Sequence, residues 1–272
     1  MRSTKTVGPV SARLLTEFQR KGRHVFTLSG AQQILKTNYF ATAKLLTMMR
    51  QRGLIARIKA ATYLILQTGS ENTQLKNWPI LARELAGSDP YFISYYSAMR
   101  MHGMTAHPLL EVYLTLPKRR SARKISGITY RFIYSKSEHF WGAAKHWATK
   151  QEQIQVSDLE RTVLDTLDRP DLCGGFIEVA RGIWGKQKEM DQERLSQYAK
   201  KFHSKAAIKR LGYILEIFCA GSNHIPALWE STAGTKDYVL LDPHGPKEGK
   251  YVSRWRIRLN VPLEELKGSV SG

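Results

Sequence analysis

Apolar residues recur at helical spacing through the first fifty residues of the chain. The pattern predicts helices over residues 11–20, 29–35 and 39–52. Gly22 and Gly53 follow the first and third stretches, where glycine readily adopts the left-handed conformation that ends a helix. Each stretch also has a residue suited to capping its start: Ser11, Ser29 and Asn38. At Ser29 the sequence Ser-Gly-Ala-Gln forms a full capping box. We therefore expect three short helices joined by tight turns.

The third stretch divides into an apolar stripe and an outward face. The stripe should pack against the first two helices: Ala41, Leu45, Leu46 and Met49. The outward face is mixed: Tyr39, Phe40, Ala43, Lys44, Thr47 and Arg50. Residues 54–58 and 62–66 are rich in β-branched and apolar residues and predict two strands joined by a small basic turn. Helix, turn, helix and a strand pair in this order predict a winged helix-turn-helix.

In that fold the third helix enters the major groove of DNA, where small and polar side chains reach base edges and Lys and Arg contact phosphates. Candidates for the groove are Asn38, Tyr39, Lys44 and Thr47, and the neighbouring Thr37 and Ala43 complete the predicted surface. Candidates for phosphate contact, two of them on the wing, are Lys36, Arg50, Arg57 and Lys59. The alternatives are a merely solvated basic face and a protein-docking module.

The charge distribution agrees with a polyanionic partner. The chain has 272 residues, 42% of them hydrophobic, with 42 Lys and Arg against 23 Asp and Glu, a net charge of +19. Residues 1–70 hold twelve of the cations and one acid, Glu17. A polar stretch without apolar periodicity follows at residues 67–74. We therefore predict a winged helix-turn-helix domain over residues 1–68 and a larger domain over residues 76–272.

The larger region mixes both kinds of element. Predicted helices cover residues 78–86, 94–103, 157–168, 176–184, 192–202 and 205–219, and predicted strands cover residues 110–116, 128–134, 238–241 and 253–259. A capping box at Ser157 opens the third of these helices, which has a buried stripe, Leu159, Val163, Leu164 and Leu167, and a polar face, Asp158, Arg161, Asp165 and Asp168. The fold class is therefore α+β, a winged helix followed by a mixed α/β domain.

Two further groups of cations could form a second basic patch. The first lies in the connection between two predicted strands: Lys118, Arg119, Arg120, Arg123 and Lys124. The second lies on one face of the last predicted strand: Arg254, Arg256 and Arg258. Both could contact phosphates while the N-terminal domain binds an operator. A solubilising hairpin tip and an ordinary exposed sheet face are the alternatives.

Several ordered segments resemble one known family, the AbiEi-type antitoxins of type IV toxin-antitoxin systems. They are the N-terminal helices ending in Gly53-Leu54-Ile55 and Thr62-Tyr63; Tyr91-Phe92-Ile93-Ser94, Ser97-Ala98 and His102-Gly103; Val156 to Pro170 with Gly174-Gly175; and Arg210 to Glu216. Together they span most of the chain.

The resemblance implies a division of labour between the two domains. The N-terminal domain would repress its own operon by binding inverted repeats in the promoter, and the C-terminal domain would neutralise a nucleotidyltransferase-like toxin without a stable complex. The family supplies no catalytic residues to carry over, so no enzymatic activity is expected. An effector-binding or dimerising winged-helix regulator without a toxin is the alternative.

Strong catalytic and metal signatures are missing from the sequence. It has no Walker loop, dinucleotide fingerprint, His-Glu-x-x-His helix or Cys-x-x-Cys pair. Asp165, Asp168 and Glu178 could hold a divalent metal for nuclease chemistry, but such acids more often form a salt-bridged helix face. Cys173 and Cys219 alone give neither a disulfide framework nor a zinc site. With no apolar segment long enough for a membrane, we expect a cytoplasmic protein without a cofactor, a metal or a membrane partner.

Overall fold

The computed structural model describes residues 7–66, 77–125, 127–218, 225–232 and 234–268. Internal contacts divide the chain into two compact units. The first unit is Met1–Phe92, Leu109–Ser135 and Lys145–Gln155, and the second is Ile93–Pro108, Lys136–Ala144 and Val156–Gly272. The predicted boundary between residues 68 and 76 falls outside the described residues and stays a prediction. The protein is a mixture of helices and strands, in agreement with the predicted α+β class.

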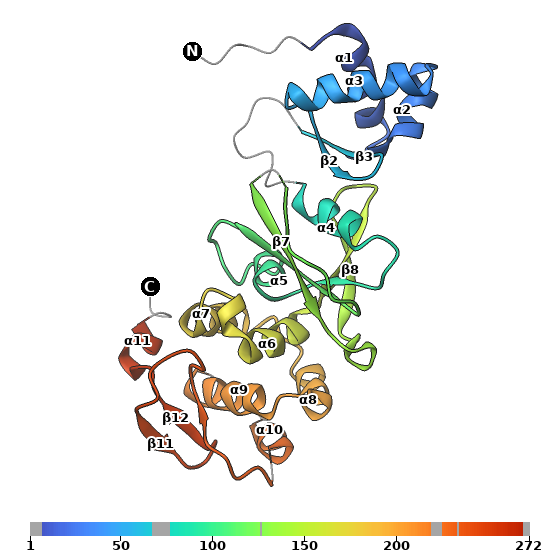
Figure 1. The fold of residues 1–272 in the computed structure, drawn as a ribbon. Coiled ribbons are helices and arrows are strands. Elements are labelled where there is room, and N and C mark those ends of the chain that lie inside the picture. Colours follow the sequence, from blue (N-terminus) through green and yellow to red (C-terminus); the bar gives the residue numbers. More distant parts are fainter. Residues whose placement is uncertain (1–6, 67–76, 126, 219–224, 233, 269–272) are drawn as a thin grey trace. The chain divides into compact units, whose positions relative to one another are not determined.

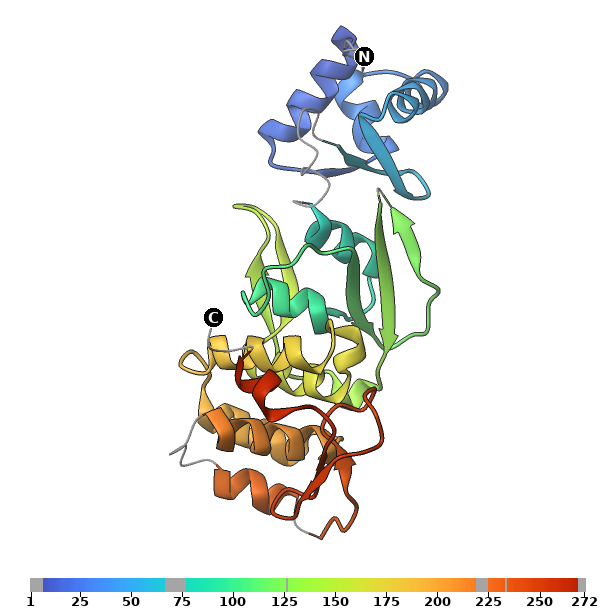
Figure 2. The same cartoon turned by 90° about the vertical axis from the view of Figure 1, so that its left-hand side faces the viewer.

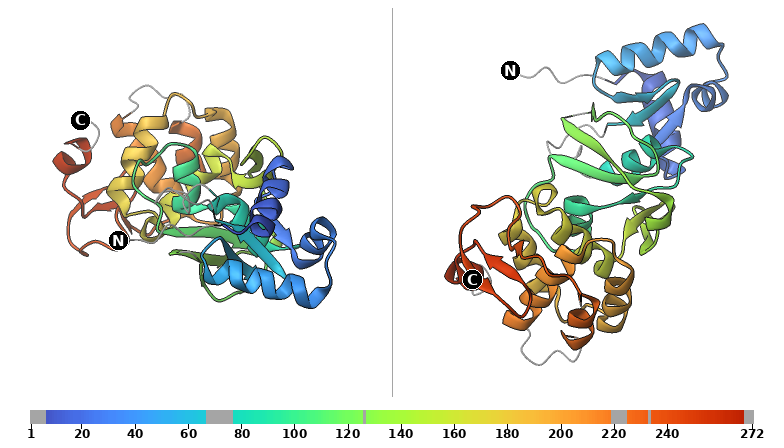
Figure 3. Two further views of the ribbon diagram at one scale, coloured as in Figure 1. Left: turned by 90° about the horizontal axis from the view of Figure 1, so that it is seen from above. Right: turned by 60° about the horizontal axis from the view of Figure 1, so that its bottom comes forward.

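Residues 7–66 of the first unit, here called the head, contain three helices and a three-stranded sheet (Figures 1 and 3). The elements in chain order are α1 (Pro9–Arg20), β1 (Val25–Thr27), α2 (Leu28–Leu35), α3 (Tyr39–Gln51), β2 (Ile55–Lys59) and β3 (Thr62–Ile65). The strand order is β1-β3-β2, and both pairings are antiparallel. The three helices and the β2–β3 pair agree with the sequence pattern. Strand β1 was not predicted, because three residues are too few for a period-2 signal.

Two of the three predicted helix caps are wrong. Helix α1 begins at Pro9 instead of after Ser11, because the fixed backbone angle of proline suits a first helical turn. Helix α2 is capped by Thr27, whose Oγ1 accepts a hydrogen bond from the Gly30 backbone nitrogen at 3.1 Å. Thr27 offers the same hydroxyl acceptor two residues before Ser29. The cap of α3 is confirmed, since Asn38 Oδ1 accepts a hydrogen bond from the Ala41 nitrogen at 2.9 Å.

The head has its own hydrophobic core. It gathers buried side chains from all six elements or their flanking turns: Leu14, Phe18, Phe26, Leu28, Ala31, Leu46, Met49, Leu54, Ile55 and Ile65. Helix α3 contributes Leu46 and Met49 together with Thr42, whereas Ala41, predicted in the stripe, is exposed. Thr42 can be buried because its hydroxyl donates to the Asn38 carbonyl oxygen at 2.9 Å and lies 2.8 Å from the Thr37 hydroxyl.

The first unit continues into a larger sheet (Figure 2). Its elements are α4 (Trp78–Ala86), β4 (Phe92–Ile93), β5 (Glu111–Leu116), β6 (Arg123–Ile125), β7 (Ile128–Tyr134), β8 (Ala143–Trp147) and β9 (Gln153–Ser157). The sheet order is β6-β7-β5-β4-β9-β8, and the division between the units falls within β4, β8 and β9. Strands β5 and β7 are parallel, so their connection is no simple hairpin; β6 reverses the chain and pairs antiparallel with β7.

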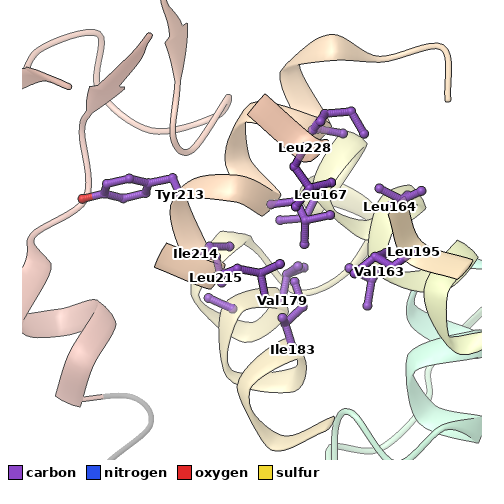
Figure 4. Packing of buried hydrophobic residues seen from close by; sticks show 14 of the residues in the cluster. Val163, Leu164, Leu167, Val179, Ile183, Leu195, Tyr213, Ile214, Leu215 and Leu228 are labelled. Atoms are coloured by element: carbon purple, nitrogen blue, oxygen red, sulfur yellow. The ribbon is translucent and has the colours of Figure 1, made fainter. Parts of the chain in front are cut away.

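The second unit is mainly helical. It contains α5 (Tyr95–Met101), α6 (Leu159–Asp168), α7 (Phe176–Lys186), α8 (Gln192–Lys201), α9 (Lys205–Phe218), α10 (Ile225–Ser231) and α11 (Leu263–Gly268), with 3-10 turns at Ser137–His139 and Pro170–Leu172. A small sheet is formed by β10 (Val239–Leu240), β11 (Lys250–Val252) and β12 (Ile257–Leu259). Figure 4 shows apolar side chains that meet in its core, including Leu164, Leu167, Val179, Ile183 and Leu228.

Two sequence predictions in the second unit are corrected. Helix α6 is capped by Asp158, whose Oδ1 accepts from the Arg161 nitrogen at 2.8 Å, and Ser157 instead ends strand β9. The predicted strand 253–259 is a strand only over its last three residues. Its first four residues form the turn between β11 and β12, with Arg256 in the left-handed region at φ 48°. Short apolar runs fit a tight turn as well as a strand, so alternation alone did not separate them.

An ion pair lies inside the second unit, where the sequence predicted a solvent-facing helix surface. Arg161 Nε donates to Asp165 Oδ1 at 2.8 Å, and both residues are buried. The Arg161 guanidinium also donates to the carbonyl oxygens of His139 and Trp141, each at 3.0 Å, and stacks over the Trp141 ring. Burial raises the pKa of the Asp165 carboxyl above its ordinary value, and the Arg161 charge opposes this shift.

Replacing Arg161 by Ala should lower the free energy of unfolding by about 3–5 kcal/mol at neutral pH, because it leaves a buried carboxylate without its cation. Burial then acts on Asp165 without the opposing charge of Arg161 and raises its folded-state pKa further above the unfolded value. The deficit relative to the wild type should therefore be full at neutral pH and shrink as the pH falls through that raised pKa. Denaturant titrations over a pH series measure it. Arg161→Ala combined with Asp165→Asn, which removes the charge, should unfold less readily than Arg161→Ala alone; equal stability of the two would contradict the account.

Candidate nucleic-acid interface

The outward side of α3 presents aromatic and cationic side chains together. Tyr39 and Phe40 are 57% and 81% exposed, and their rings meet edge to face at 5.6 Å between centroids. Lys44, Thr47 and Arg50 are exposed further along the helix. Phe40, Lys44 and Thr47 follow the four- and three-residue spacing of one helix face. Two aromatic rings this exposed at one helix start are unusual for a surface that only faces water.

The side chains just before α3 form more hydrogen bonds within the head than the sequence predicted. The Asn38 side chain caps the helix, and the Thr37 hydroxyl bonds to that of Thr42, so both stabilise the turn between α2 and α3. Lys36 is exposed and ends α2 in the left-handed region at φ 54°. Ala43 is half-buried and packs against the core of the head. Of the predicted groove-facing residues, Tyr39, Lys44 and Thr47 therefore have the most accessible side chains.

The two predicted wing cations have different surroundings. Arg57 on β2 is exposed, and its Nε lies 3.4 Å from the Lys59 carbonyl oxygen. Lys59 Nζ donates to the Glu84 carbonyl oxygen at 3.2 Å and lies 3.7 Å from a Glu84 carboxylate oxygen. Because Glu84 on α4 already balances the charge of Lys59, Arg57 is the stronger candidate for a phosphate contact.

The predicted second patch in the first unit is partly neutralised. Lys118 Nζ lies 2.8 Å from Asp89 Oδ1, and the Arg120 guanidinium bonds to the other oxygen of the same carboxylate. Arg120 also donates to the carbonyl oxygens of Leu85 and Ala86 at the end of α4. The Lys118 hydrogen bond is the largest cause that lowers the pKa of the Asp89 carboxyl below its ordinary value.

The other three cations of that patch remain accessible. Arg119 stacks over the Tyr134 ring at 4.9 Å, while Arg123 and Lys124 are exposed on β6 and not on a loop. The five cations therefore do not form one common patch, because two of them are paired with Asp89 and the other three remain accessible.

The three arginines near the C-terminus do not share one strand face. Arg254 and Arg256 lie in the turn, and only Arg258 lies on β12. Arg254 forms an ion pair with Glu216 at 2.8 Å, Arg256 donates to the Thr235 carbonyl oxygen at 2.6 Å, and Arg258 stacks over the Tyr251 ring. The three guanidinium groups have different partners and do not lie on one strand face, so the predicted row of charges is wrong.

The structure adds one cationic group to the head that the sequence analysis did not select. Arg13, Lys21 and Arg23 are exposed around a shallow hollow of about 390 Å³ beside α1 and α2. Its one acidic residue is Glu17, which forms an ion pair with Arg20. The run of cations from Arg20 to Arg23 is visible in the sequence, and Arg13 lies seven residues before Arg20, on the same face of the predicted helix.

The acids weighed for metal chemistry are engaged in ion pairs. Asp165 pairs with Arg161, Asp168 lies 3.3 Å from the His203 ring, and Glu178 lies 3.1 Å from Arg181. The hydrogen bond that the His203 ring donates to the Asp168 carboxylate raises the pKa of the ring above its ordinary value. Within the described ranges, no three His, Cys, Asp or Glu side chains come together in a way that could hold a metal ion. In the same ranges, none of the helices has the length and apolar character needed to span a membrane.

Comparison with known proteins shows a likeness of fold. No family model matches the chain, and no curated protein matches it. The structure is similar to the crystal structure of the RV2827C protein from Mycobacterium tuberculosis, with a TM-score of 0.69 at 13% sequence identity. The match covers 98% of this chain and 96% of that chain, so the two folds correspond over nearly their full lengths.

Replacing Asn38 by Ala should destabilise the head by about 1 kcal/mol, because the helix loses its side-chain cap. Asn38→Ser retains a capping oxygen and should cost only a few tenths of that amount. Thermal unfolding followed by circular dichroism compares the two. If both variants are as stable as the wild type, the cap does not hold α3 in place.

Proposed function

We propose that the chain is a DNA-binding antitoxin whose head is a winged helix-turn-helix. In this proposal α3 is the recognition helix, β2 and β3 form the wing, and the head binds inverted repeats in the promoter of its own operon. The rest of the chain neutralises a nucleotidyltransferase-like toxin.

The observation that carries the DNA-binding part is the outward side of α3. It combines exposed Lys44 and Arg50 with the exposed rings of Tyr39 and Phe40. No acidic residue occurs anywhere between residues 18 and 70, so nothing within the head past α1 repels a phosphate backbone. Apolar groups such as the Phe40 ring and the Thr47 methyl suit contact with thymine methyl groups, and a lysine suits guanine acceptors or phosphates.

The wing supports the same placement. A two-residue connection, Ala60-Ala61, separates β2 from β3, and Arg57 is exposed on the strand that leads into it. A cation there can contact the phosphate backbone beside the groove that a recognition helix occupies. Such contacts add affinity that depends on salt but not on base sequence.

The antitoxin part rests on the family resemblance of the segments from Tyr91 to Glu216. Several of these segments build the interior of the second unit: Ile93, Ser97, Val163, Leu164 and Leu211 are all buried. Their side chains therefore maintain the fold of that unit.

Operator binding should separate groove-reading from phosphate-binding residues. Lys44→Ala should weaken binding to the operator roughly tenfold or more and reduce the preference over unrelated duplex, since a base contact is worth about 1–3 kcal/mol. Arg50→Ala should weaken operator and unrelated duplex by similar factors and lower the salt slope by about 1. Fluorescence anisotropy over a salt series, with footprinting of the upstream region, measures both.

Two matched controls belong to this experiment. Arg20→Ala removes a cation from α1 that pairs with Glu17, and should leave operator affinity near that of the wild type. Thr47→Ser keeps the hydroxyl that donates to the Ala43 carbonyl oxygen but removes the methyl, so it tests thymine contact separately from helix packing. If the Lys44→Ala and Thr47→Ala variants both protect the same bases as the wild type does, the assignment of α3 as the recognition helix is wrong.

The toxin-neutralising part is tested in cells. Expression of the adjacent gene, if it encodes a nucleotidyltransferase-like protein, should arrest growth, and co-expression of this chain should restore it. The Lys44→Ala/Thr47→Ala variant, expressed from an unrelated promoter, should lose repression of the operon but still restore growth, because the proposal assigns the two tasks to different domains. Failure of the wild-type chain to restore growth would overturn the antitoxin role and leave the DNA-binding role to be judged separately.

A further inference from the structure

The second unit contains an open cavity of about 670 Å³, within the size range of small-molecule sites. Its walls come from α9, α10, the turn after α10, and the turn between β11 and β12, elements shown in orange and red in Figure 1. The lining combines three cations, three hydroxyl side chains and two tryptophans: Lys209, Arg254, Arg256, Thr232, Thr235, Ser253, Trp229 and Trp255. None of the described residues that line it is acidic.

Two of the cations are held by neutral groups. Lys209 is only 2% exposed, and its Nζ donates to the Asp237 carbonyl oxygen at 2.6 Å. Arg256 donates to the Thr235 carbonyl oxygen, also at 2.6 Å. Main-chain carbonyls satisfy hydrogen bonds but do not cancel a full positive charge.

The electrostatics of this pair favour an added anion. Burial lowers the pKa of the Lys209 amine below its ordinary value, the charge of Arg256 lowers it further, and Asp237 opposes both more weakly. The two cations are thus close enough to repel each other in a partly desolvated place. A phosphate group there would relieve the repulsion and accept charge-assisted hydrogen bonds.

The backbone at Arg256 is also constrained. Its φ of 48° lies in the left-handed region, which a non-glycine residue rarely adopts. The buried neighbours Trp255 and Ile257 anchor the turn on both sides. Trp255 closes the wall against Gly212, where an added Cβ would lie only 2.2 Å from the indole ring. The turn is therefore fixed by packing, and Arg256 is held at the cavity by the fold.

Trp229 supplies a flat apolar surface at the same cavity. Its side chain belongs to α10 and is 49% exposed, while its Nε1 donates to the Arg254 carbonyl oxygen at 3.2 Å. That hydrogen bond fixes the edge of the ring and leaves part of the indole accessible. Indole faces stack well on nucleobases.

From these features we infer that the cavity binds a nucleotide, with its phosphate groups at Lys209 and Arg256 and its base against Trp229. The site uses no residue of the head, so it is a second binding function beside the proposed recognition of DNA. Arg254 also lines the cavity, but Glu216 balances its charge, so the phosphate site is assigned to Lys209 and Arg256.

The test is isothermal titration of the full chain, free of DNA, with ATP, GTP, AMP and inorganic phosphate. At least one of the nucleotides should bind at one site per chain, more tightly than inorganic phosphate. Arg256→Asn should weaken that nucleotide about tenfold or more, and Lys209→Gln by a similar factor. Trp229→Leu should weaken it roughly tenfold while leaving phosphate binding unchanged.

Matched variants separate the site from general effects. Asn tolerates the left-handed conformation at position 256, and Gln at position 209 can still donate to the Asp237 carbonyl, so thermal unfolding should confirm that both variants fold. Lys250→Gln removes an exposed cation from β11, the strand that leads into the turn at the cavity, and this variant should bind the nucleotide as tightly as the wild type does. Arg50→Ala should also leave nucleotide binding unchanged, whatever its effect on DNA.

Three results would overturn the inference. The first is that none of the three nucleotides binds at about 1 mM. The second is that the wild type and the Arg256→Asn variant bind nucleotide equally. The third is that inorganic phosphate binds as tightly as the nucleotides and that Trp229→Leu changes neither affinity. The last outcome would mean that the cavity attracts anions in general.

Discussion

The burial of one side of α3 is the constraint on which the proposed function depends. Leu46 and Met49 are almost completely buried against Leu14, Phe18 and the neighbouring core of the head. Because a helix turns by a fixed angle per residue, this contact determines which side chains face away. The buried packing of Leu46 and Met49 therefore determines that the aromatic pair and the cations of α3 face outward.

The second unit uses buried charge in a similar way, but for structure. Arg161 connects α6 to the carbonyl oxygens of His139 and Trp141, and Asp165 on the same helix balances it. Arg210 on α9 makes a comparable link, donating to the carbonyl oxygens of Leu167 and Leu240. Guanidinium groups therefore join α6 to the segment at residues 139–141, and join α9 to α6 and to β10. Arg161 and Arg210 are buried, so these two cations belong to the interior of the unit.

Local signals in the sequence were reliable where one residue decides the geometry. Asn38 caps α3 as predicted, and α8 and α4 begin at Gln192 and Trp78, the first residues of the predicted ranges 192–202 and 78–86. Signals with a close competitor were less reliable: Thr27 took the role assigned to Ser29, and Asp158 the role assigned to Ser157. A shift of one or two residues decides such cases, and it depends on tertiary packing.

Long-range features could not be read from the sequence at all. The parallel pairing of β5 with β7 depends on the insertion of β6, and the Lys59–Glu84 and Lys118–Asp89 pairs join residues about 25 to 30 positions apart. The cavity beside α10 brings together segments that begin at Lys209 and end at Arg256. Periodicity describes one element at a time and carries no information about which elements meet.

The ion pair between Lys59 and Glu84 has a consequence for how the wing can meet a polyanion. A phosphate that approaches Lys59 competes with a carboxylate already in place, so the lysine exchanges one anion for another and the net gain is small. Glu84 would keep a partner after such an exchange, because the Arg83 guanidinium lies 3.2 Å from its carboxylate. In the proposed complex Arg57 is therefore the wing cation that can contact a phosphate without first breaking an ion pair.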